Sequence, residues 1–186
     1  MSHRDHQLLK ESRKGHVGRI SRLLEEGADV NFRGKYGYTA LMEAASRGHL
    51  PAVEYLLDSG ADPRIGAYDN APPTFFACVY GFTEVVELLL KRGADPNAGR
   101  DSGRHVRGNS RGVSQLHVAI SNGFERIALA LVNAGANIDH LNGGKSALAA
   151  AAERKMMGVV ERIREVDLTR RQSRGSHALG EGVREA

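Results

Sequence analysis

The segment Tyr38–Asp62 reads YTALMEAASRGHLPAVEYLLDSGAD, and the segment Ala71–Asp95, which lies 33 residues later, reads APPTFFACVYGFTEVVELLLKRGAD. Both segments end on a leucine-rich stretch followed by Gly-Ala-Asp, and Gly48 and Gly81 keep the same spacing in their middle. A fixed period of this length is the signature of a protein built from stacked repeats. The period therefore decides the architecture before any single residue is considered.

Three less regular copies surround these two segments. Val113–Asn137 reads VSQLHVAISNGFERIALALVNAGAN, and it begins 42 residues after the preceding copy. Lys145–Ile163 keeps the helical pattern without the closing Gly-Ala-Asp, and Asp5–Asp29 keeps the second half of the unit with a polar first half. About five units result, with atypical units at both ends, as the capping of a repeat array requires.

Each unit contains two short apolar stripes at helical spacing. Thr39, Ser114 and Ser146 stand where a hydroxyl can cap the first helix of a unit, whereas Pro72 removes that hydroxyl from the third unit. Glycines after the second helix predict left-handed turns. Small residues are expected to let neighbouring helices approach closely: Ala44, Ala45, Ala77, Cys78, Ala119, Ala151 and Ala152.

These phrases resemble the ankyrin-repeat family over roughly residues 5–166, through TALMEAA with RGH, SQLHVAI with NG, and the recurring LL-x-x-G-A-D. The resemblance implies an all-α solenoid of stacked helix-turn-helix units with projecting β-hairpin loops. We expect one repeat domain over residues 1–166, with units at about 1–33, 34–66, 67–108, 109–140 and 141–166 and an insertion at 99–108. Residues 167–186 hold few apolar side chains, and we expect them to form a disordered tail.

Composition indicates a cytoplasmic protein. The single cysteine, Cys78, excludes a disulfide framework, and the polar start MSHRDHQLLKES does not resemble a signal peptide. No stretch approaches the roughly 18 apolar residues that cross a bilayer, so we expect no membrane segment. We also expect a monomer. The net charge of +4 is uneven: residues 99–112 sum to +3 and residues 168–186 to +2, which leaves −1 for the rest.

No constellation of residues indicates an enzyme, so we expect no catalytic residue, no cofactor and no metal site. His16, His49 and His117 fit the repeat pattern, and the other histidines have no partner at ligand spacing. Cys78 aligns with a buried small position and has no recognisable base. Asn31 and Asn97 are expected to organise hairpin turns, although such asparagines are hydroxylation targets in some ankyrin-like repeats.

The resemblance implies that hairpin tips and the exposed side of each first helix line a concave face. Tyrosine and arginine, which are enriched in interface hot spots, are frequent among the positions it nominates. Packing between tips is the alternative explanation for the tyrosines, and at least one of Phe75 and Phe76 is expected to be an exposed apolar anchor. The nominated residues are Arg13, Lys14, Arg33, Lys35, Tyr36, Tyr38, Met42, Ser46, Arg47, Tyr68, Asp69, Phe75, Val79, Tyr80, Ser110, Arg111, Val113, Ser121 and Asn122.

The insertion at 99–108 departs from the pattern of the family. Its arginines, together with Arg111, could hold an acidic partner or phosphates, although a tolerated surface insertion is the alternative. These arginines are Arg100, Arg104, Arg107 and Arg111.

The sequence thus predicts a non-enzymatic protein–protein interaction module, an adaptor or an inhibitor whose partner carries an acidic surface. The alternative is electrostatic binding of nucleic acid through the insertion and the tail. Against that alternative, the stack itself sums to −1, and its basic residues are not interleaved with aromatic residues along a groove.

Overall fold

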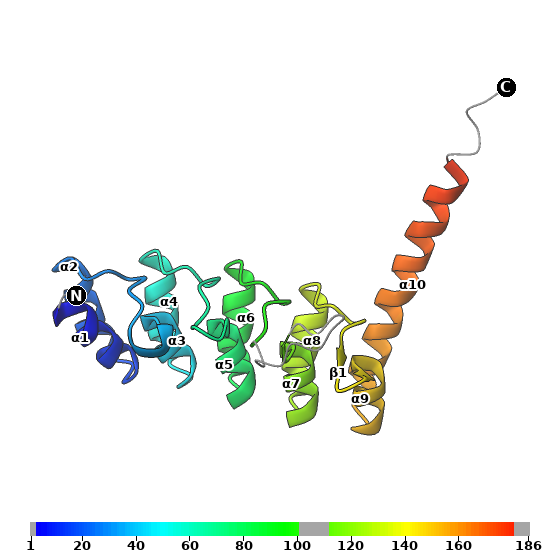
Figure 1. Cartoon of the computed structure of the whole chain (residues 1–186), viewed down its shortest axis with the longest axis horizontal. Helices are drawn as coiled ribbons and strands as arrows, with labels where there is room; N and C mark the ends of the chain where they lie inside the picture. The colour runs from blue at the N-terminus through cyan, green and yellow to red at the C-terminus, as the bar shows by residue number, and fades with distance from the viewer. Residues whose placement is uncertain (1–2, 101–111, 181–186) are drawn as a thin grey trace.

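A row of helix pairs forms the molecule, and a last long helix extends from one end of the row (Figure 1). The structure is a computed structural model that describes residues 3–100 and 112–180, with side chains up to residue 172. Over these residues the helices form five pairs, as the period predicts. The elements are α1 (His3–Ser12), α2 (Val17–Glu25), the 3-10 turn η1 (Lys35–Gly37), α3 (Ala40–Ala45), α4 (Leu50–Asp58), α5 (Pro73–Tyr80), α6 (Thr83–Lys91), α7 (Gln115–Asn122), α8 (Glu125–Asn133), β1 (Leu141–Asn142), β2 (Lys145–Ser146), α9 (Ala147–Glu153) and α10 (Met157–Gly180).

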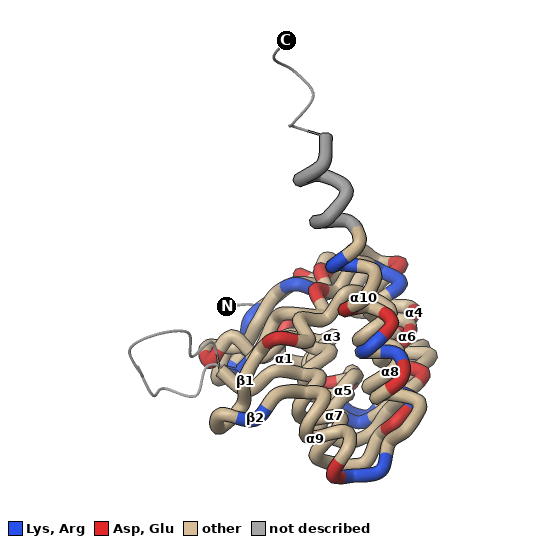
Figure 2. The backbone as a smooth tube through the Cα atoms, turned by 90° about the vertical axis from the view of Figure 1, so that its right-hand side faces the viewer, with Lys and Arg blue, Asp and Glu red and all other residues tan. Residues whose placement is uncertain are grey.

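The pairs build a layered array. Viewed along the stack, the first helices of the pairs lie between the second helices on one side and the strands β1 and β2 on the other (Figure 2). We call α2, α4, α6, α8 and α10 the outer helices and α1, α3, α5, α7 and α9 the inner helices. β1 and β2 pair antiparallel, with Leu141 opposite Ser146.

Three of the inner helices begin at the predicted hydroxyl caps. Oγ1 of Thr39 accepts a hydrogen bond from the Met42 N–H at 3.3 Å, and Oγ of Ser146 accepts one from the Ala149 N–H at 3.2 Å. Ser114 caps α7 in the same way. Helix α5 lacks a side-chain cap at Pro72, also as predicted, and Pro73 supplies the fixed φ that suits a first helical position.

Glycines between the two helices of a unit give the next unit room to pack. Gly48 and Gly81 have φ of 70° and 79°, which only glycine adopts at low cost. A Cβ on Gly48 would lie 2.5 Å from the ring of Phe82, and one on Gly81 would lie 2.7 Å from the ring of Phe124. Glycine therefore recurs at the repeat period because an aromatic ring of the next unit packs against each of these positions.

A continuous apolar core runs through the stack. It extends from Leu8 on α1 to Ile163 on α10, and most of the predicted small residues lie inside it. Ala152 is the exception, because it is exposed in the last pair, where no further unit packs against α9. Since each pair buries its apolar faces against its neighbours, the array is stabilised as a unit.

Turn asparagines link hairpins of successive units. The Asn31 side chain donates to the Gly60 carbonyl (3.2 Å) and accepts from the Asp62 N–H (2.9 Å). Asn97 makes the same two contacts with Gly135 and Asn137. These contacts agree with the predicted turn-organising role. Arg64 occupies the equivalent place in the second turn and binds Asp62 of its own turn instead.

The predicted tail differs from its prediction up to residue 180, and its residues 181–186 lie outside the described residues. Residues 167–180 continue α10 as helix instead of forming a disordered segment, and Arg170 reaches Asp139 at 3.5 Å. Two physical reasons account for the difference. The first half of α10 is already nucleated by packing on α8 and α9, and extending a helix costs far less than starting one. In addition, no proline follows Met157.

Candidate protein-binding face

The exposed side of the inner helices presents three positions per unit. On α3, for example, Leu41, Ala44 and Ala45 are buried, whereas Glu43 is only partly buried and Arg47, just after the helix, is exposed. The same register recurs from unit to unit because the three positions are three and four residues apart on a helix. The positions are Lys10, Arg13 and Lys14; Glu43, Ser46 and Arg47; Phe76, Val79 and Tyr80; Val118, Ser121 and Asn122. We call them the floor, and together with the hairpin tips at 33–38 and 66–70 they form what we call the inner face.

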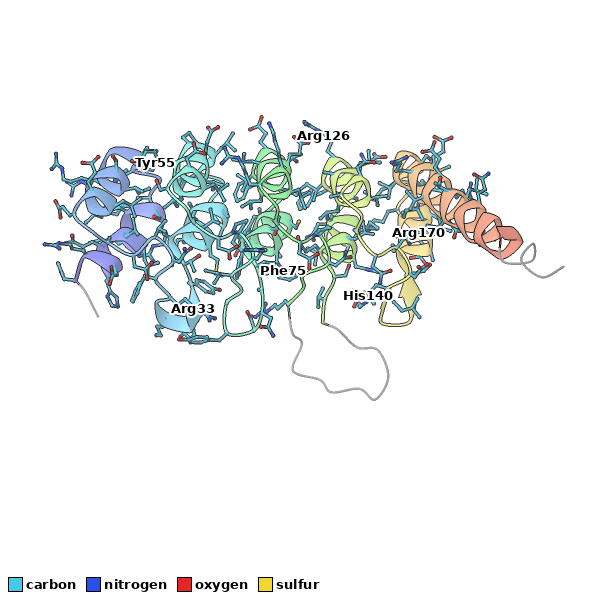
Figure 3. All side chains as sticks on the ribbon, turned by 90° about the horizontal axis from the view of Figure 1, so that it is seen from above. Arg33, Tyr55, Phe75, Arg126, His140 and Arg170 are labelled. Carbon is cyan, nitrogen blue, oxygen red and sulfur yellow. The ribbon has the colours of Figure 1, made fainter. Side chains whose placement is uncertain are left out.

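The two hairpin tips form a joined aromatic platform. The Tyr68 N–H donates to the Tyr36 carbonyl at 3.0 Å, so the tip at 66–70 is fixed to the tip at 33–38. Arg33 stacks over the Tyr68 ring at 5.2 Å, and Lys35 lies over the Tyr36 ring at 4.8 Å. The rings nevertheless stay open to solvent, with exposed fractions of 62% for Tyr36 and 71% for Tyr68. Figure 3 shows Arg33 at the hairpin side of the array, away from the outer helices.

Tyr36 also holds an unfavourable backbone conformation. Its φ of 61° lies in the left-handed region, where a bulky side chain is uncommon. Holding such a residue there costs of order 1 kcal/mol. Asn or Gly would occupy this turn position with less strain. The conformational preference of this turn therefore does not explain a tyrosine at position 36.

Aromatic rings connect the tips to the floor. Tyr36 contacts Tyr38 edge-on at 6.4 Å between ring centroids, and Tyr38 contacts Phe76 at 5.1 Å. Tyr80 adds a ring that is 59% exposed. Burial raises the pKa of the Tyr38 hydroxyl, and the carboxylate of Asp69 acts in the same direction, so Tyr38 remains a neutral hydroxyl at ordinary pH.

Two nominated residues lie beneath this face. Met42 and Phe75 are 1% and 4% exposed, so the expectation of surface contacts is wrong for both. They occupy equivalent positions one period apart, and His117 is buried at the same position of the fourth unit. The prediction placed the exposed position one residue too early in each of these helices, which corresponds to about 100° around the helix axis. Phe76, the alternative for the apolar anchor, is the partly exposed ring.

The base of the insertion is anchored on both sides. The Val113 N–H donates to the Arg100 carbonyl at 2.9 Å, which brings the two ends of the insertion together. Arg100 Nε binds the Asp69 carboxylate at 2.7 Å. The fully buried amide of Gln115 donates to the carbonyls of Asp95 and Ala98 below the stem. Arg100 and Asp69 therefore neutralise each other, while Arg104, Arg107, Ser110 and Arg111 lie outside the described residues.

Charge on the floor is concentrated in the first two units. Lys14 pairs with Glu11 at 3.2 Å, but in the described part of the chain the Arg13 and Arg47 guanidinium groups have no ion-pair or hydrogen-bond partner. Burial raises the pKa of Glu43, while Arg13 and Arg47 act in the opposite direction, which places this carboxylate near both. Asn122, in the fourth unit, donates to the Val79 carbonyl at 3.5 Å.

The reactive side chains have structural surroundings. Burial raises the pKa of Cys78 to about 12, and its thiol lies 3.8 Å from the Gln115 side-chain oxygen, so little thiolate forms. His117 Nε2 donates to the Lys145 carbonyl at 3.0 Å, and burial lowers the pKa of His117. The described residues contain no group of three side chains suited to a metal ion. Among these same residues no helix is long and apolar enough to cross a membrane.

Comparison with protein families agrees with this geometry. A family model of ankyrin repeats matches residues 8–100 with three copies. The chain belongs to the ankyrin-repeat family. Both the predicted family and the predicted all-α repeat solenoid are confirmed. Ankyrin repeats generally mediate protein–protein interaction, and the family is typically non-enzymatic.

Individual relatives share a short stretch with this ankyrin-repeat chain. Over 44 residues it is 52% identical to the mitochondrial disaggregase of Bos taurus and 50% identical to that of Homo sapiens. Each match covers 24% of this chain and 6% of the relative. The chain therefore spans only a small part of the length of these relatives.

The nominated positions omit four floor residues: Lys10, Glu43, Phe76 and Val118. A signal for them was available, because each lies three residues before a nominated position of the same unit, namely Arg13, Ser46, Val79 and Ser121. Counting back one helical turn from those positions would have found all four.

Proposed function

We propose that this ankyrin-repeat protein is a non-enzymatic binding module that holds a protein partner on its inner face. It acts as a monomeric adaptor or inhibitor in the cytoplasm and regulates the partner by covering part of its surface. A rigid array loses little conformational entropy on binding, so a few aromatic and arginine anchors supply the affinity.

The observation that carries the proposal is the state of the tyrosines. Tyr55, between outer helices, donates its hydroxyl to Ser21 at 2.9 Å and thereby joins two units. Within the described residues, the hydroxyls of Tyr36, Tyr68 and Tyr80 have no protein partner, and their rings are largely exposed. Tyrosine rings with an apolar body and a free polar end are the usual anchors of protein interfaces.

Nucleic-acid binding remains the second candidate, and one structural feature favours it. The structure brings cations against exposed aromatic rings, at Arg33 with Tyr68 and at Lys35 with Tyr36. Such pairs can stack bases and neutralise phosphates. The pairs are confined to two hairpin tips, whereas single-stranded nucleic acid needs a groove that tracks several nucleotides.

The test is affinity capture of a partner from the native lysate after nuclease treatment, read by mass spectrometry. The triple variant Tyr36→Ala, Tyr68→Ala, Tyr80→Ala is compared with a matched outer-face variant, Arg19→Ala, Glu54→Ala, Lys91→Ala, whose side chains are exposed on α2, α4 and α6. A near-stoichiometric protein that survives nuclease, is lost with the tyrosine variant and is kept by the control is the expected result. Recovery that vanishes with nuclease would move nucleic acid to the front, and loss only in the control would contradict the inner-face assignment.

A further inference from the structure

The floor of the inner face changes character along the array. Its first unit offers three cations, Lys10, Arg13 and Lys14, whereas the third unit offers the apolar side chains of Phe76, Val79 and Tyr80. The fourth unit offers small and neutral side chains, among them Ser121 and Asn122. The surface therefore has two distinguishable ends, which a partner can read in one direction only.

The surrounding charges preserve this difference. In the first two units, Lys10, Arg13, Lys14 and Arg47 stand against the carboxylates Glu11 and Glu43, which leaves +2; the tip residues Arg33 and Lys35 raise the sum to +4. In the described part of the third and fourth units, the inner face carries only the ion pair of Asp69 with Arg100, which sums to zero. Opposite charges attract across an interface and like charges repel. The positively charged part of the face, on the first two units, therefore selects carboxylates.

We propose that the inner face binds an extended acidic segment of its protein partner, with carboxylates on the first two units and an apolar side chain on the third. The inference rests on the proposed protein-binding function and specifies its ligand. Carboxylates lie against Arg13 and Arg47, the two floor guanidinium groups that have no hydrogen-bond or ion-pair partner within the described residues. The apolar side chain rests on Phe76, Val79 and Tyr80.

The spacing of the two features in the partner follows from the spacing of the units. Packed helices lie about 8–10 Å apart, so the first and third units are separated by about 20 Å along the array. An extended chain rises about 3.3 Å per residue, so a carboxylate on the first unit lies about six residues from the apolar side chain, and a carboxylate on the second unit lies about three residues from it.

The experiment is selection of binders to the full chain from a displayed library of random peptides of about 16 residues, long enough to cover about 50 Å when extended. Selected peptides are synthesised with a fluorescent label, and their Kd is measured by anisotropy. The inner-face variant is Arg13→Glu with Arg47→Glu, and the matched control is Arg19→Glu with Arg22→Glu on α2. The contact of Arg13 with its neighbour is made by its backbone carbonyl, which accepts from His49, so the substitution keeps it. Unfolding curves confirm that both variants fold.

The expected result is enrichment of peptides with Asp and Glu at about three and about six residues from one Leu, Ile or Phe. Their Kd rises about tenfold or more in the inner-face variant and at elevated salt, and stays within about twofold in the control. Peptides that depend on Tyr68 and Tyr80 but show no acidic enrichment would overturn this inference while leaving the protein-binding function intact. If no selected peptide responds to Tyr68→Ala or Tyr80→Ala, both proposals fail. A labelled 12-mer of uridine that binds at physiological salt and competes with the peptides would also overturn it in favour of nucleic acid.

Discussion

The outer helices and the inner face carry the same kinds of polar side chain, but the two regions differ in what these side chains contact. Between outer helices, polar side chains bind the neighbouring unit, and Figure 3 shows Tyr55 and Arg126 on that side of the array. On the inner face, Tyr36, Tyr68, Tyr80, Arg13 and Arg47 carry side chains without a hydrogen-bonded or ion-paired partner among the described residues. The outer contacts are Tyr55 with Ser21, Arg92 with Asp58, Arg126 with Glu87, and Arg162 with Asn133.

This difference teaches where stability and recognition reside. A side chain already bonded to its neighbour must lose that bond before it can bind a partner, whereas an unpartnered one loses only solvent. Substitutions in the outer half of the array should therefore change stability, and substitutions on the inner face should change binding. Four substitutions can break or sharpen that separation.

The largest effect is expected for Leu89→Ala on α6. Leu89 is fully buried between units, and its truncation leaves a cavity that should lower the free energy of unfolding by about 2–5 kcal/mol. Urea unfolding followed by circular dichroism measures the loss. Leu88→Ala, at the partly buried neighbouring position, should cost clearly less. Weaker partner binding by the folded Leu89 variant would contradict the separation between residues for stability and residues for binding.

A gain is expected for Arg64→Asn. Asparagine here would stand one period after Asn31 and could reach the Gly93 carbonyl and the Asp95 N–H, closing the gap in the ladder of turn asparagines. Two hydrogen bonds of this kind should raise the free energy of unfolding by about 1 kcal/mol, a shift of about 2–4 °C in Tm. Arg64→Ala is the control that removes arginine without adding an amide. Equal stability of the two variants would contradict the claim that an asparagine at this position stabilises the array by bonding the next hairpin.

Much of the architecture could be predicted from the sequence because it repeats. The 33-residue period, the caps at Thr39 and Ser146, and the glycines under Phe82 and Phe124 are local requirements that each unit states again. The side of each inner helix that faces solvent was predicted less well. Phe75 and Phe76 are adjacent and equally apolar, and which of them is buried depends on the neighbouring unit, which helical spacing alone does not reveal.

The remaining differences depend on contacts distant in sequence. The ion pair of Arg100 with Asp69 joins residues from two hairpins, and no short motif announces it. The length of α10 follows from its packing on α8, because the composition of residues 167–180 by itself favours a loose tail. The sequence contains the charged residues of the floor, but only the packing of the helices shows that they follow one another along a single surface.

Tyr36→Asn should separate stability from binding on the inner face. Asparagine tolerates the left-handed φ of this position better than tyrosine, although the Lys35 contact with the ring is lost. The free energy of unfolding should stay unchanged or rise by up to about 1 kcal/mol, while partner affinity falls. Thermal unfolding and a binding titration on the same sample give both quantities. A destabilised variant with unchanged affinity would show that Tyr36 serves packing between tips.

The smallest effect on stability is expected for Glu43→Gln. Burial raises the pKa of Glu43 above its ordinary 4.5, so its ionised form is disfavoured in the folded state and destabilises it at neutral pH. This penalty is relieved as the pH falls through the raised pKa and is absent below 4.5. The variant should gain less than about 1 kcal/mol at pH 7 and nothing below the ordinary pKa. Unfolding curves across this range test the sign, and acidic peptides should bind the variant more tightly.

The most direct test of the separation between the two faces is covalent labelling of tyrosine rings, read by mass spectrometry in the free protein and in its complex with the captured partner. Tyr36, Tyr68 and Tyr80 should react rapidly in the free protein and become protected in the complex, while Tyr55, bonded to Ser21, reacts slowly in both. Protection of Tyr55 or of the peptides from α4 and α6, with Tyr36, Tyr68 and Tyr80 still reactive in the complex, would contradict the assignment of binding to the inner face.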